Sequence, residues 1–120
     1  MNRVLIMSSS RDIGEGLKHL LGSSGVLQAE IYEGDPWRIP PAFATDYDLL
    51  LVDLSQPETN SLHAIRQLRL HQPVLPILAL GTYSEPEFAR AIMQAGASAY
   101  LSIDSPGEMM QQMISSVCNS

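Results

Sequence analysis

The sequence predicts an α/β fold: a doubly wound, five-stranded parallel sheet with strand order 2-1-3-4-5 and helices on both faces. Three observations support this fold. Short apolar runs of strand length alternate with segments of helical periodicity, and five such runs fit into 120 residues. The run 49–52 is apolar at every position, as expected of a parallel strand that is buried on both faces. A chain of this length forms one domain around a single core.

The first half of the chain contains three expected strands and one clear helix. The strands are 3–7, 26–32 and 49–53. The helix covers 11–21, because Ile13, Leu17, Leu20 and Leu21 recur at helical spacing and Gly22 follows as a stop. Residues 33–44 contain Pro36, Pro40 and Pro41, which permit at most a short helix that begins near Pro40.

The second half alternates three helices with two strands. The expected strands are 76–80 and 99–102, and the first helix is 61–70. A helix over 85–94 has Ser84 as its predicted N-cap, Pro86 in its first turn and Gly96 after its end. The last helix is capped by Asp104 or Ser105, has Pro106 near its first position, and has an expected inner face of Met109, Met113, Ile114 and Val117.

Composition excludes several classes of protein. Thirteen acidic residues against seven Lys and Arg give a net charge of −6, which argues against direct binding of DNA or RNA. A single cysteine, Cys118, excludes an internal disulfide framework. The N-terminal apolar run is too short for a signal peptide or a membrane span. We therefore expect a soluble, cytoplasmic protein.

Asp53 is the best candidate for a functional residue. It follows the apolar run 49–52, so its carboxylate is expected at the C-terminal edge of the sheet, where open α/β sheets bind ligands. The alternative interpretation is a strand-end residue that caps the next turn. Ser8, Ser9 and Ser10 precede a helix and suit either an anion site or simple helix capping.

Other chemically notable residues support no site of their own. His19, His63 and His71 lack metal-ligand spacing, and no catalytic pair or triad is visible, so we expect no enzymatic activity. Met109, Met110 and Met113 suit a core or an interaction face, and Trp37 either anchors its loop or marks a contact surface.

Two motifs carry a family resemblance. Residues 47–57 (YDLLLVDLSQP) are followed by Leu62, Ile65 and Leu68, and residues 95–101 (AGASAYL) follow the fourth strand and its helix. Over nearly its whole length the chain resembles a receiver domain of two-component response regulators, with their CheY-like, flavodoxin-like fold. Residues 15–17 and 104–109 are most similar to the LuxR/NarL type, in which a receiver precedes a helix-turn-helix domain. The resemblance implies that residues 1–120 are a single receiver-like domain at the N-terminus of a longer regulator.

The resemblance makes Asp53 the phosphoacceptor, but the other functional positions depart from the family. Ser8 and Ser9 replace the two acids that hold Mg²⁺, Gly81 replaces the switch threonine or serine, and Ile103 replaces the lysine. We therefore expect weak or absent Mg²⁺ binding and no other cofactor. Thr82 lies one position past the switch and either substitutes for it or is a turn residue. Tyr100 matches the aromatic residue whose orientation reports activation, or it is a fixed packing residue.

Three functions remain open from the sequence. The first is a degenerate receiver that signals without ordinary phosphorylation, through contacts with a sensor histidine kinase, an output domain or a second copy. Those contacts are expected at the face formed by residues 85–94, 99–102 and the last helix. The second is a receiver that is still phosphorylated at Asp53. The third is a flavodoxin-like phosphate or nucleotide binder that uses Ser8 to Ser10 as its cradle.

Overall fold

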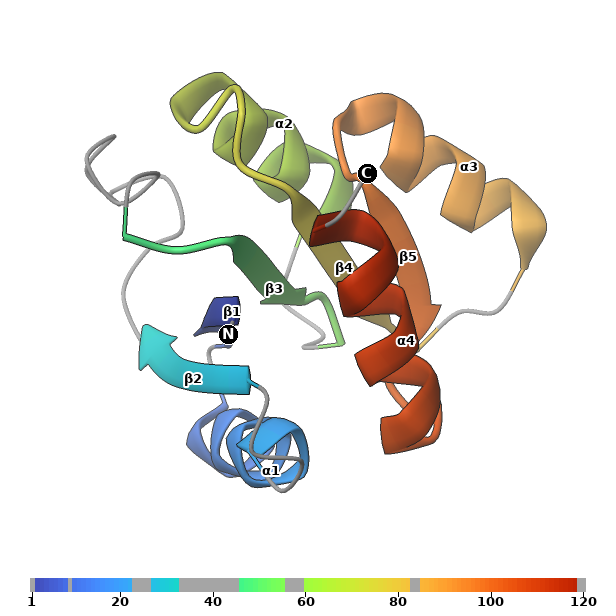
Figure 1. Ribbon diagram of the computed structural model, residues 1–120. Coiled ribbons are helices and arrows are strands. Elements are labelled where there is room, and N and C mark those ends of the chain that lie inside the picture. The colour runs from blue at the N-terminus through green and yellow to red at the C-terminus, as the bar shows by residue number, and fades with distance from the viewer. Residues whose placement is uncertain are drawn as a thin grey trace.

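One parallel sheet organises the molecule. The structure is a computed structural model that describes residues 2–8, 10–22, 27–32, 46–55, 60–82 and 85–118. Its strands are β1 (Asn2–Met7), β2 (Leu27–Tyr32), β3 (Leu49–Asp53), β4 (Ile77–Gly81) and β5 (Ala99–Ser102). They pair in parallel in the order β2-β1-β3-β4-β5, which confirms the predicted topology (Figure 1). The helix expected near Pro40, and Trp37, lie outside the described residues.

Four helices cover the two faces of this sheet. They are α1 (Arg11–Gly22), α2 (Ser61–His71), α3 (Pro86–Ala95) and α4 (Gly107–Cys118). Helices α2 and α3 lie side by side on one face, while α1 and α4 pack on the other (Figure 1). All five residues of β3 are buried; Leu50 and Val52 belong to the α2/α3 cluster, and Leu49 and Leu51 to the α1/α4 cluster. The uninterrupted apolar run thus serves two cores at once.

Two local expectations were wrong. Met109 does not belong to the inner face of the last helix: it is 47% exposed, whereas its neighbour Met110 is 1% exposed. Met110 precedes Met113 and Ile114 by three and four residues and so shares their face of the helix, whereas Met109 lies about 100° away around the helix axis. The N-cap of α3 is Glu85 rather than Ser84; its side chain makes no capping hydrogen bond, and Pro86 occupies the first turn.

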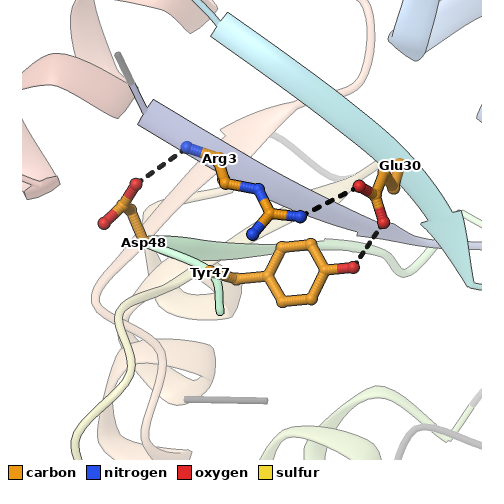
Figure 2. A network of polar contacts seen from close by, with 4 residues as sticks. All are labelled: Arg3, Glu30, Tyr47 and Asp48. Carbon is orange, nitrogen blue, oxygen red and sulfur yellow. Dashed lines mark hydrogen bonds and ion pairs between the residues drawn. The ribbon is translucent and has the colours of Figure 1, made fainter. Parts of the chain in front are cut away.

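A polar network fixes strands β1, β2 and β3 near the sheet edge at which β1 and β3 begin (Figure 2). The backbone N–H of Arg3 donates to Asp48 Oδ2 at 2.8 Å, and its guanidinium Nη2 donates to Glu30 Oε1 at 3.1 Å. The Tyr47 hydroxyl donates to Glu30 Oε2, and the guanidinium carbon of Arg3 lies 5.1 Å from the centre of the Tyr47 ring. Tyr47 and Asp48, which opened the recognised motif, therefore join three strands at the end of β3 opposite Asp53.

No helix among the residues that the structure describes is both long and apolar enough to span a membrane.

Candidate functional site

Asp53 is a buried carboxylate at the C-terminal end of β3, where it is only 5% exposed. Its Oδ2 accepts a hydrogen bond from Ser8 Oγ at 2.7 Å. Its Oδ1 accepts from the backbone N–H of Ser55 at 2.9 Å and from the Ser55 hydroxyl. Both carboxylate oxygens are thus hydrogen-bonded, as a buried charge requires, and the hydrogen atoms come from neutral groups.

Strand register brings Ser8 to Asp53. Met7 of β1 pairs with Val52 of β3, so the next residue along each strand, Ser8 and Asp53, follows in the same register. Ser8 is 7% exposed and also connects to helix α1, because the Ser10 backbone N–H donates to Ser8 Oγ at 3.1 Å. Ser10 Oγ in turn accepts from the Ile13 N–H at 3.3 Å, which is an N-cap interaction. Ser9 lies outside the described residues.

Ser55 was missed from the predicted site, although its position two residues after Asp53 could have indicated the contact. An aspartate side chain often accepts a hydrogen bond from the backbone N–H two residues later, and Ser55 stands at that position with a second donor on its side chain. This turn is the structural interpretation that was left open for Asp53. The observed contact with Ser8 adds a second role, because it joins β3 to β1 at the edge of the sheet.

Gly81 and Tyr100 lie against each other beside this edge. Gly81 is the last residue of β4, and a Cβ atom built on it would collide with the Tyr100 hydroxyl and lie 3.0 Å from Cε1 of the ring. The Tyr100 ring also meets the Phe88 ring of α3 edge-on, with centroids 5.4 Å apart and an angle of 73° between the planes. Tyr100 therefore occupies the volume that a side chain at position 81 would take.

The two remaining predicted positions have ordinary surroundings. Thr82 is exposed at the bend after β4. Ile103 is half-buried and packs against the α1/α4 cluster, and its backbone N–H donates to the Gly81 carbonyl at 2.8 Å. The structure therefore brings Ser8 to Asp53 and Gly81 to Tyr100, while Ile103 serves the core on the α1/α4 face.

The donors around Asp53 can be compared with the needs of a divalent cation. Mg²⁺ binds through oxygen atoms and favours anionic ligands. Within residues 2–8, 10–22, 27–32, 46–55, 60–82 and 85–118, no cluster of three or more His, Cys, Asp and Glu side chains could hold a metal ion. Ser8 and Ser55 offer hydroxyl oxygens in place of further carboxylates. This donor set fits Mg²⁺ poorly.

Comparison with known proteins identifies the family. The sequence model of the response regulator receiver domain matches residues 4–115. The chain belongs to this family. The chain is 31% identical to the transcriptional regulatory protein YdfI of Bacillus subtilis over 92% of its own length. It is 30% identical over 82% of its length to the response regulator RppA of a Synechocystis strain. This receiver spans 52% of YdfI and 43% of RppA, or about half of each relative.

Solved structures confirm the receiver fold. A two-component response regulator of the LuxR family from Aurantimonas superposes with a TM-score of 0.83 at 21% identity, covering 99% of this chain and 86% of that one. The chemotaxis protein CheY4 of Vibrio cholerae superposes with a TM-score of 0.76 at 22% identity, covering 98% of both chains. The CheY-like architecture expected from the sequence is therefore shown.

Proposed function

We propose that this receiver is atypical and regulates its output without ordinary Mg²⁺-dependent phosphorylation of Asp53. One observation carries the proposal: Ser8 Oγ donates a 2.7 Å hydrogen bond to Asp53 Oδ2, at a position where the family has a metal-binding acid. A neutral hydroxyl replaces a negative charge there. The Ser8 and Ser55 donors that hold the carboxylate are all neutral.

Charge explains why this replacement matters. Transfer of a phosphoryl group to a carboxylate brings negative groups together, and catalysis depends on positive charge that offsets them. Among the residues that the structure describes, the hydrogen-bond donors to Asp53 are the Ser8 hydroxyl and the Ser55 hydroxyl and amide, none of which carries a net charge. Position 103 supplies a half-buried apolar side chain, packed against the α1/α4 cluster, in place of the family's lysine. We therefore expect Mg²⁺ to bind weakly or not at all.

The proposed output is transcriptional. YdfI is by its name a transcriptional regulatory protein, and this chain spans about half of it. We propose a LuxR/NarL-type regulator of the cytoplasm, in which the receiver acts through an attached or separate DNA-binding domain and has no enzymatic activity of its own. Contacts with that domain, a sensor histidine kinase or a second copy would use the face of α3, β5 and α4.

The alternative function, a phosphate or nucleotide binder with Ser8 to Ser10 as its cradle, is disfavoured. Ser8 is buried, and its hydroxyl donates a hydrogen bond to the Asp53 carboxylate.

A phosphorylation assay tests the proposal directly. The protein would be incubated with Mg²⁺ and a small phosphodonor such as acetyl phosphate, and its intact mass would be measured. We expect no added phosphoryl group in the wild type, with a receiver that has all three acids as the positive control. Added mass in the wild type that is absent from Asp53→Asn would show that the site is competent and would overturn the proposal.

A reporter assay extends the test to the full-length regulator. We expect Asp53→Asn to change output by less than about twofold, since signalling does not pass through an aspartyl phosphate. Deletion of residues 2–118 is the control for complete loss of receiver function. A loss with Asp53→Asn that equals the loss on deletion would mean that regulation does depend on phosphorylation.

A further inference from the structure

We infer that Gly81 is a seat for the Tyr100 ring, meaning that the ring fills the space left by the missing side chain at position 81. We infer further that the ring, packed in this position, holds α3 and β5 in a single arrangement whatever the state of Asp53. The first half of this inference depends only on packing. The second half extends the proposed function from the acceptor site to the face that meets partners.

Strand pairing places the ring over Gly81. Tyr100 of β5 is paired with Ala79 of β4, and Gly81 lies two residues beyond Ala79 on the same face of the sheet. Ala79 belongs to the α2/α3 cluster, and Tyr100 packs against that same cluster. From its position opposite Ala79, the ring leans along the strand direction and reaches the end of β4.

The ring, rather than the backbone, is what requires glycine at position 81. Among the described glycines only Gly96 has a positive φ, so the conformation of Gly81 is open to any residue. A Cβ atom there would nevertheless collide with the Tyr100 hydroxyl and lie 3.0 Å from Cε1 and 3.1 Å from Cζ. Every other amino acid at this position would therefore force the ring to move.

The seated ring ties helix α3 to the sheet. Phe88 lies in the first turn of α3, and its ring meets Tyr100 edge-on at a centroid distance of 5.4 Å. Aromatic pairs favour this edge-to-face geometry. Since Gly81 fixes Tyr100 and Tyr100 contacts Phe88, the start of α3 takes its position from the end of β4. The face of α3 and β5 is thus set by packing between these three residues.

A set of double mutants measures the seat. Gly81→Ala would be made in the wild type, in Tyr100→Phe and in Tyr100→Ala, and each protein would be unfolded in urea. In the wild type the added methyl group should raise the equilibrium constant for unfolding about tenfold or more, as overpacking does. The effect should be smaller with Phe, which lacks the hydroxyl but keeps the ring carbons. It should disappear or reverse with Ala, because Gly→Ala at an unstrained position stabilises a protein.

Gly16→Ala is the matched control for this series, because a Cβ atom at Gly16 of α1 would meet nothing within 4 Å. It should stabilise the protein in every background. An equal effect of Gly81→Ala with Tyr, Phe and Ala at position 100 would overturn the seat. Should Gly81→Ala fail to fold in the wild type, recovery of folding in Tyr100→Ala would support the seat, and failure in both would overturn it.

Ring resonances test the second half of the inference. The NMR signals of the Tyr100 and Phe88 rings would be recorded before and after treatment with acetyl phosphate and Mg²⁺, alongside the intact mass. Unchanged signals are expected. Added mass with unchanged signals would overturn the proposed function and leave the fixed face standing, whereas added mass with shifted ring signals would overturn both. Unchanged mass would leave the proposed function intact, and a ring shift in that case would overturn the fixed face alone.

Discussion

The pairing of Ser8 with Asp53 follows directly from the register of β1 and β3, so it lies at the end of the central strand of the sheet. Both residues are less than one-tenth exposed, and their 2.7 Å hydrogen bond closes the C-terminal edge between the two strands. Ser8 also joins this edge to the start of α1 through Ser10. A hydroxyl at position 8 therefore has a structural role that is separate from any role in signalling.

Ser8→Ala should show this structural role as a loss of stability. Without the hydroxyl, Oδ2 of Asp53 loses a donor in a buried site, which should lower the free energy of unfolding by about 1–3 kcal/mol. Asp53→Asn should cost less, because an asparagine keeps one oxygen for Ser55 and gains an amide that can donate to Ser8 Oγ. Urea denaturation measures both variants. A Ser8→Ala protein as stable as the wild type would contradict the importance of this bond.

Tyr47 gives the molecule a pH-dependent contact at the opposite edge of the sheet. Burial, followed by the hydrogen bond to the Glu30 carboxylate, raises the pKa of Tyr47 from 10.0 to about 12. The neutral phenol is favoured in the folded state, so its stabilisation is complete below pH 10 and is lost as the pH rises towards the folded pKa. The Tyr47–Glu30 contact should therefore weaken in strong alkali. It should also weaken in acid, because the same hydrogen bond lowers the pKa of the Glu30 carboxyl and is lost when that group is protonated.

An ultraviolet absorbance titration tests this pKa. A tyrosine that ionises near pH 12 should be present in the wild type and absent from Tyr47→Phe. In Glu30→Gln the pKa of Tyr47 should fall but remain above 10.0, because burial is the larger cause. An unchanged titration curve in both variants would show that Tyr47 is not the late-ionising group.

At the scale of elements, Arg69 joins the ends of two helices. It lies near the end of α2, and its Nε donates to the Gly96 carbonyl after α3 at 2.9 Å. Its Nη1 donates to the carbonyls of Gln72 at 3.0 Å and Leu75 at 2.8 Å. A cation at these positions also interacts favourably with the negative ends of the two helix dipoles. Burial lowers the pKa of Arg69 from its usual value without changing this role.

Replacement of Arg69 should loosen α2 and α3 together. Arg69→Met keeps an aliphatic stem of similar shape but removes every donor, and we expect the free energy of unfolding to fall by about 2 kcal/mol or more. The stability of Arg69→Lys should lie between that of the wild type and that of Arg69→Met, because one ammonium group cannot make all the hydrogen bonds of a guanidinium. Hydrogen exchange should speed up at the ends of both helices. Faster exchange confined to α2 would contradict a shared clamp.

Helix α4 shows where sequence reasoning loses accuracy at this scale. The prediction placed Met109 on the inner face, although Met110 is the methionine that forms an i, i+3, i+4, i+7 set with Met113, Ile114 and Val117. The position of the helix start is a different matter, because its first residue, Gly107, lies so close to α1 that a Cβ atom would stand 2.7 Å from Cδ1 of Leu20. That close approach is a tertiary contact, and no local pattern in the sequence encodes it.

For the whole molecule, local pattern predicted the sheet while long-range packing determined the details of the site. The buried run 49–52 and the chemistry of parallel sheets were enough to place Asp53 at a strand end. The contact between Asp53 and Ser8 joins residues 45 positions apart, and the sequence suggested only that both belong to one site. The contact of Tyr100 with Gly81 depends on the lean of a ring across two strands, which spacing alone could not predict.

The stability of the whole domain should report whether a cation can enter the Asp53 site. A ligand that binds the folded state alone raises stability in proportion to ln(1 + [L]/Kd). In the wild type, added MgCl₂ should raise the melting temperature no more than NaCl of equal ionic strength, because Ser8 already satisfies Asp53 Oδ2 without charge. Scanning calorimetry or a thermal shift assay makes the measurement.

Ser8→Asp should reverse this behaviour. It would place a second carboxylate beside Asp53 in a buried site, and repulsion between the two like charges should destabilise the metal-free protein. Mg²⁺ offsets that repulsion, so the variant should regain about 1.4 kcal/mol of stability at ten times its dissociation constant, whereas Ser8→Ala should not respond. Equal stabilisation by Mg²⁺ of the wild type and of Ser8→Asp would show that the hydroxyl at position 8 already suffices for a cation. The charge argument for an atypical receiver would then fail.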